Sequence, residues 1–83
     1  MKNKTRKIKV LLFAELSEKL GWDEKYFSLD LIEDKKAKSI LKHINMNVAH
    51  QSIIVAINKE ISSLEATVKD NDEIAFMPIF TGG

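Results

Sequence analysis

The 83-residue chain contains no cysteine, one proline and three glycines, and only 7% of its residues are aromatic. Without cysteine there is no disulfide, no thiol nucleophile and no thiolate ligand for a metal. No apolar run is long enough to span a membrane or to form a secretory signal. A net charge of +1 gives no basis for binding nucleic acid, whose phosphates require a concentrated basic surface. We therefore expect a cytoplasmic protein without a membrane or nucleic-acid partner.

The composition is typical of a folded domain. An apolar content of 45% and a charged content of 30% suit a single domain of this length, over residues 1–83. The basic segment 1–7 is expected to be a frayed leader, as chain termini often are. Residues 78–83 are expected to form a flexible functional tail.

Hydrophobic periodicity predicts the order β, α, β, α, β, β, β. The strands are expected at 8–12, 27–31, 53–57, 60–61 and 73–77, and the helices at 14–20 and 37–44. Gly21 is the expected stop of the first helix and Asp34 the expected N-cap of the second. Pro78 is expected to end the last strand, because it cannot donate to a ladder. The elements predict an α+β roll, a small sheet with one principal helix packed across it.

The first strand predicts an unusual outer face for this sheet. If the side chains at positions 8, 10 and 12 face the helix, Leu11 and Phe13 point away from it. Met77 is expected on the same outer face, and Ile61 is a further candidate. A sheet covered on one side carries polar residues on the other, so exposed apolar side chains there indicate a partner. The alternative is that the first helix or the loops cover these side chains.

The body of the domain offers no set of side chains suited to catalysis. His43 and His50 have no partners at the spacing of a metal site or an acid–base pair. Asp70, Asp72 and Glu73 predict a turn with a solvated face, because they supply too few ligands for calcium. We therefore expect no metal site, no cofactor bound by this chain and no enzymatic activity of the chain alone.

The end of the chain is its most unusual feature. Two of the three glycines are the last two residues, an arrangement that chance gives in roughly one of two hundred sequences. Residues without a Cβ atom can pass through a channel too narrow for side chains. The carboxylate of Gly83 is unhindered, so another enzyme could activate it as an acyl-adenylate. Gly83 is therefore the candidate reactive residue, preceded by Thr81 and Gly82; a frayed end without function is the alternative.

Three segments, 9–16, 55–59 and 70–83, resemble the small, sulfur-carrier subunit of molybdopterin synthase. An acidic turn, a strand, Pro78 and a terminal Gly-Gly come in the same order and spacing as in that family. Where the family often has a second proline, this chain has Ile79. The resemblance implies a β-grasp fold, as in ubiquitin.

The resemblance also implies a sulfur carrier in molybdenum cofactor biosynthesis. An E1-like adenylating enzyme would use ATP to activate Gly83, and a sulfur donor would convert it to a thiocarboxylate. The tail would enter the large synthase subunit, within a heterotetramer, and the sulfur would form the dithiolene of molybdopterin. At matching positions Phe13, Ile61, Phe76 and Met77 would lie at or near the apolar interface, although alternation places Phe76 in the core first. A thiamine-pathway sulfur carrier and a ubiquitin-like modifier or binding module are the alternatives.

Overall fold

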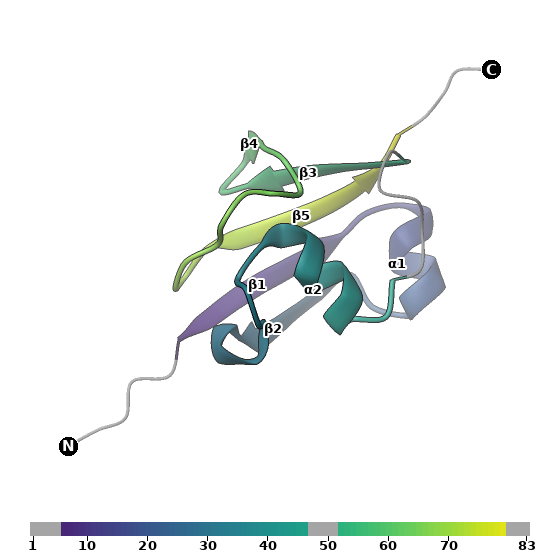
Figure 1. Cartoon of the computed structure of the whole chain (residues 1–83). Coiled ribbons are helices and arrows are strands. Elements are labelled where there is room, and N and C mark those ends of the chain that lie inside the picture. The colour runs from purple at the N-terminus through teal and green to yellow at the C-terminus, as the bar shows by residue number, and fades with distance from the viewer. Residues whose placement is uncertain (1–5, 47–51, 80–83) are drawn as a thin grey trace.

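The computed structural model describes residues 6–46 and 52–79, which form one mixed sheet with two α-helices (Figure 1). The elements are β1 (Lys7–Leu12), α1 (Glu15–Leu20), β2 (Glu24–Ser28), the 3₁₀ turn η1 (Leu29–Leu31), α2 (Ala37–His43), β3 (Ile53–Ile57), β4 (Glu60–Ile61) and β5 (Glu73–Pro78). The strands lie in the order β2-β1-β5-β3-β4. β1 and β5 are parallel, and the other neighbouring pairs are antiparallel. This architecture is the α+β roll that the sequence predicts.

The hydrophobic core lies between the inner face of the sheet and α2, which crosses in front of β1 and β5 in Figure 1. Ile74 and Phe76 of β5 are both 0% exposed. Other core residues from the sheet and from α2 with its C-cap are Ile8, Val10, Leu12, Val55, Ala37, Ile40, Leu41 and Ile44. The predicted period of two in β1 and of about 3.6 in α2 are both confirmed.

The second strand lies three residues earlier than its alternation predicts. β2 spans Glu24–Ser28, so the predicted strand at 27–31 is wrong in its bounds. Leu29 and Leu31 belong to η1, after which the N–H of Ile32 donates to Leu29 O. This tight turn buries Leu29 and Ile32 and leaves Leu31 62% exposed. Alternation alone cannot distinguish the end of a strand from a short 3₁₀ turn that follows it.

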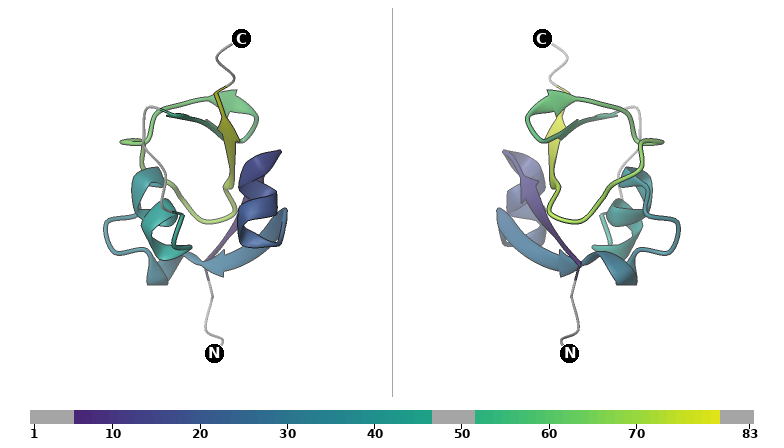
Figure 2. Two further views of the ribbon diagram at one scale, coloured as in Figure 1. Left: turned by 90° about the vertical axis from the view of Figure 1, so that its right-hand side faces the viewer. Right: turned by 90° about the vertical axis from the view of Figure 1, so that its left-hand side faces the viewer.

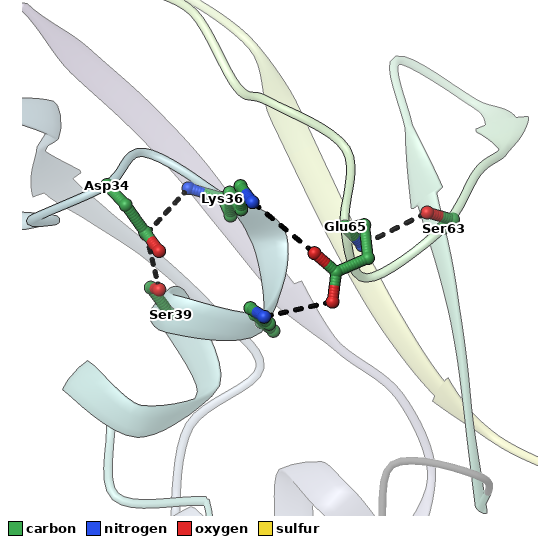
Figure 3. Close-up of polar contacts among 6 residues, drawn as sticks. Asp34, Lys36, Ser39, Ser63 and Glu65 are labelled. Atoms are coloured by element: carbon green, nitrogen blue, oxygen red, sulfur yellow. Dashed lines mark hydrogen bonds and ion pairs between the residues drawn. The ribbon is translucent and has the colours of Figure 1, made fainter.

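The N-terminus of α2 is capped differently from the prediction. The N-cap is Lys36 rather than Asp34, and no side chain caps the helix. Its first two N–H groups donate to backbone carbonyls in the segment 62–72, which joins β4 to β5. Asp34, which precedes the helix, accepts hydrogen bonds from the Lys36 N–H and from the hydroxyl of Ser39 in the first turn of α2 (Figure 3). A distant backbone segment thus satisfies groups that the sequence-based prediction assigned to a local cap.

The segment 62–72 lies on the same side of β5 as α2 (Figure 2). Glu65 connects it to the helix, with carboxylate oxygens 3.4 Å from Lys36 Nζ and 2.9 Å from Lys38 Nζ (Figure 3). Hydrogen bonds from Lys38 and then Lys36 lower the pKa of Glu65. The Glu65 side chain is 65% exposed, so solvent screening keeps the contribution of these ion pairs to stability small.

A tight turn joins β3 to β4 and is linked to the start of β5. Asn58 and Lys59 both have positive φ, 53° and 72°, a backbone geometry that Asn tolerates in tight turns. The Asn58 amide donates to Asp72 Oδ1 and accepts from the N–H of Glu73, both at 2.9 Å. These bonds hold the hairpin against β5 at one end of the sheet.

β1 begins one residue earlier than predicted. Lys7, which the sequence assigns to the leader 1–7, is the first residue of β1. Arg6 forms an ion pair with Asp30 of η1. Residues 1–5 lie outside the described part of the chain.

Candidate functional site

The outer face of the sheet, turned away from α2, carries apolar residues toward the end of β5. The pairing register places four outward residues in one row across β1, β5, β3 and β4: Leu11, Ala75, Ala56 and Ile61. Met77 of β5 and Ile54 of β3 form the next row. Phe13 continues beside them, because its N–H donates to Phe76 O at 3.2 Å. We call this set the apolar outer patch: Leu11, Phe13, Ile54, Ala56, Ile61, Ala75 and Met77.

Much of the apolar outer patch is open to solvent. Phe13 is 45% exposed and Ile61 72%, whereas Leu11 and Met77 are half-buried. The alternative that α1 or the loops cover the patch is therefore wrong for Phe13 and Ile61. The outward side chains of β3 are more covered: Ile54 is half-buried and Ala56 is buried. Exposed apolar side chains gathered on one face indicate a partner surface.

The other half of the outer face is polar. Lys9 Nζ lies 3.8 Å from a carboxylate oxygen of Glu73 across the β1–β5 pair. Tyr26 of β2 is 56% exposed, with Lys7 and Lys9 Nζ at 5.6 and 5.8 Å from its ring centroid. Such charged and aromatic pairs are stable in water, so the exposed apolar surface of this face is concentrated in the half beside the end of β5.

Of the residues predicted for the interface, Phe76 differs from the other three. Its side chain is 0% exposed and belongs to the core, as the alternation predicts. Phe13, Ile61 and Met77 point to the outer face and are accessible to different degrees. The structure therefore brings three of the four candidates to one surface.

The last described contact of the chain with the sheet lies one residue beyond β5. Pro78 is the last residue of β5, one position beyond the predicted strand 73–77, and it is buried opposite Ile53. The N–H of Ile79 then donates to Ser52 O at 3.0 Å. The predicted tail 78–83 thus begins with two residues that belong to the ordered domain. Thr81, Gly82 and Gly83 lie outside the described residues, and their assignment stays a prediction.

Ile79 is a residue that sequence reasoning missed. It occupies the next outward position after Met77 and is 41% exposed. The available signal was the period of two, continued past Pro78 instead of stopped there. Four of the five large apolar side chains that are exposed in the described chain lie on the outer side: Phe13, Tyr26, Ile61 and Ile79.

The polar groups of the body serve the fold. The carboxylates of Asp70 and Asp72 accept hydrogen bonds from the backbone N–H groups of Lys7 and Lys69, at 2.9 and 2.8 Å. Within residues 6–46 and 52–79, no group of three His, Asp or Glu side chains is placed to hold a metal ion. His43 is exposed and contacts the Phe27 ring edge-on at 5.5 Å, and His50 lies outside the described residues.

A cavity of about 980 Å³ lies beside η1 and α2, on the other side of the sheet from the patch. Its polar residues include Asp34, Lys38 and His43. Asp34 bonds to Ser39, and Lys38 to Glu65, so both polar groups are engaged in local contacts. No acid–base pair or nucleophile converges on this cavity from the described residues that line it.

No α-helix in the part of the chain that the structure describes is long and apolar enough to cross a membrane.

Comparison with known proteins agrees with this geometry. The chain is 34% identical to the molybdopterin synthase sulfur carrier subunit of Dictyostelium discoideum, over 95% of this chain and 99% of the relative. It is 33% identical to the subunit of the same name from Haemophilus influenzae, over 92% and 99%. The crystal structure of small archaeal modifier protein 1 from H. volcanii superposes with a TM-score of 0.72 at 20% identity, over 90% and 99%. The predicted β-grasp, ubiquitin-like fold is thereby confirmed. Since the family match runs from residue 10 to residue 83, through the patch and the terminal glycines, the chain belongs to the ThiS family.

Proposed function

We propose that this chain is the sulfur carrier of a molybdopterin synthase and that Gly83 carries the sulfur as a C-terminal thiocarboxylate. The observation that carries the proposal is the similarity to molybdopterin synthase sulfur carrier subunits over nearly the whole of both chains. The family match includes Gly83 itself. Because the chain has no cysteine, no side-chain thiol competes with the terminal carboxylate as the carrier.

The chemistry requires activation of the Gly83 carboxylate, which is a poor electrophile as an anion. A carboxylate oxygen attacks the α-phosphorus of ATP and releases pyrophosphate, which leaves an acyl-adenylate. Hydrosulfide supplied by a donor then attacks the acyl carbon; the new C–S bond replaces the C–O bond to AMP, which leaves, and loss of the S–H proton gives the thiocarboxylate. We assign ATP binding and catalysis to an E1-like adenylating partner, and this chain provides the substrate carboxylate.

The apolar outer patch suits docking to the synthase large subunit, which receives the tail. Two features support this surface over others. Phe13 and Ile61 are exposed there, and β5 leads from the patch directly toward the terminal residues. Burial of these side chains in the complex, a heterotetramer in this proposal, would remove apolar surface from water. The glycines of the tail can then follow a narrow channel to the site of sulfur transfer.

Mass spectrometry of the intact chain tests the proposal. The chain is incubated with ATP, a sulfur donor and a purified adenylating enzyme, and the same chain lacking Gly83 serves as the control. We expect one oxygen of the full chain to be replaced by sulfur, at Gly83, and no change in the control. A full chain that stays unmodified under conditions that convert a known sulfur carrier contradicts the proposal.

The thiocarboxylate form also distinguishes this function from its two alternatives. Supplied to a synthase large subunit with the pterin precursor, it should yield molybdopterin. Sulfur transfer to a thiazole-forming enzyme instead would identify a thiamine-pathway carrier. Amide conjugates between Gly83 and lysines of other proteins, in cells, would identify a ubiquitin-like modifier.

A further inference from the structure

We infer that Ile79 couples docking to delivery of the terminal carboxylate, its amide anchoring the start of the tail at Ser52 and its side chain extending the apolar outer patch. The inference rests on the proposed function, because it concerns the same partner and the same tail. It adds a residue with two separable roles, one in affinity and one in positioning.

The amide role follows from the end of the β3–β5 ladder. Pro78 has no N–H to donate, yet the chain stays attached to β3 because the N–H of Ile79 donates to Ser52 O at 3.0 Å. Four residues, 80–83, follow this last observed attachment. A fully extended segment of four residues spans at most about 14 Å. The group that reacts with the terminal carboxylate must therefore come within this distance of Ile79.

The side-chain role follows from the same hydrogen bond. Because the ladder continues to Ile79, the alternation of β5 continues too, with Met77 outward, Pro78 inward and Ile79 outward. Pro78 is buried and Ile79 is 41% exposed, in agreement with this direction. Ile79 therefore prolongs the apolar outer patch to the root of the tail.

Together the two roles define the partner's surface. The partner that accepts the tail must cover the patch with an apolar surface that continues over Ile79 to the mouth of its channel. Continuity between the patch and the tail favours this partner over a second copy of the chain. The same bound geometry then determines both the position of the patch on the partner and the distance that Gly83 can reach. The tail consequently has few other positions to sample before the reaction.

The first experiment separates affinity from turnover. Ile79→Asp keeps the N–H but places a charge in the interface, which is costly to bury without a partner. We expect the Kd for the large subunit to rise at least about tenfold, with little change in kcat at saturation. Leu31→Asp is the matched control, because Leu31 is 62% exposed on the other side of the sheet, and it should leave the Kd unchanged.

The outcomes distinguish this inference from the proposed function. If Phe13→Asp weakens docking and Ile79→Asp does not, the side-chain role of Ile79 is wrong and the patch stands. If neither substitution changes the Kd, the docking surface of the proposed function is itself wrong. Thermal unfolding of each variant shows whether it retains the fold.

The second experiment tests reach. A Gly-Ser dipeptide inserted between Ile79 and Phe80 lengthens the tail by up to about 7 Å. We expect an unchanged Kd and a fall of about tenfold or more in the single-turnover rate of sulfur transfer. The Leu31→Asp control should change neither quantity. An unchanged transfer rate in the lengthened tail overturns the positioning role, as would exchange of the Ile79 amide proton at the rate of an unstructured peptide.

Discussion

The two faces of this small sheet are both rich in apolar residues, but they serve different purposes. On the inner face, Ile74 and Phe76 are 0% exposed beneath α2. On the outer face, Phe13 and Ile61 of the apolar outer patch are 45% and 72% exposed. Burial contributes to folding only for side chains that leave water on folding, so the inner face should determine stability. The outer face still has apolar surface to bury, and it should determine binding.

The largest expected effect is on the inner face. Phe76→Ala would remove a fully buried ring from the centre of the core and leave a cavity, at a cost of about 3–5 kcal/mol in the free energy of unfolding. Met77→Ala, one position along on the outer face, should cost less than about 1.5 kcal/mol. Urea denaturation of the two variants measures the difference. Equal losses would show that the two faces contribute to folding alike.

The second effect should appear in binding. Phe13→Asp and Met77→Lys each place a charge in the apolar outer patch, and burying it against the large subunit should weaken the complex at least about tenfold. The free energy of unfolding should change by no more than about 0.5 kcal/mol for Phe13→Asp, because that side chain is already exposed. Isothermal titration with the large subunit measures the affinity. A full-strength complex formed by both variants would mean that the patch is not the interface.

The two faces also differ in how well the sequence predicts them. The inner face follows from periodicity, because in β1 and α2 the buried side chains recur at regular intervals and local spacing decides their direction. The outer patch follows from the same rule, since inward positions in β1 imply that Leu11 and Phe13 point outward. For Phe76 the two predictions differed, because family resemblance assigned it to the interface and alternation placed it in the core. The structure agrees with alternation, since Phe76 is 0% exposed.

The features that the sequence-based prediction missed or placed wrongly depend on contacts between segments that are distant in the sequence. The end of β2 is set by η1, whose first residue, Leu29, donates its N–H to Arg6 O. Asp34 does not cap α2, because the segment 62–72 already accepts hydrogen bonds from the first helical N–H groups. The attachment of Ile79 to the sheet was not predicted, because its acceptor, Ser52, lies far away in the sequence. Local patterns predict directions of side chains, but they contain no information about which remote carbonyl receives an N–H.

A third prediction concerns the β3–β4 turn, whose residues Asn58 and Lys59 are not part of the apolar outer patch. Asn58→Ala would place a residue that disfavours positive φ at φ 53° and would remove two hydrogen bonds of the side chain. We expect a loss of about 1–2 kcal/mol in the free energy of unfolding, with no change in affinity for the large subunit. Asn58→Gly tolerates the positive φ but lacks the side-chain bonds, so its loss should be smaller. A weaker complex at unchanged stability would extend the docking surface to this turn.

The smallest expected effect comes from the exposed ion pairs on the inner, helical side. Hydrogen bonds from Lys38 and Lys36 lower the pKa of Glu65, so its charged form is favoured in the folded state. The resulting stability is present at neutral pH, above the unfolded-state pKa, and is lost as the pH falls through the lower, folded-state pKa. Glu65→Gln should therefore lower the Tm at neutral pH by at most about 3 °C, and the difference from the wild-type chain should vanish in acid. A difference that persists after Glu65 is protonated would assign its contribution to packing rather than charge. In that case the stability of the inner, helical side would depend on packing and not on charge, even at an exposed residue such as Glu65.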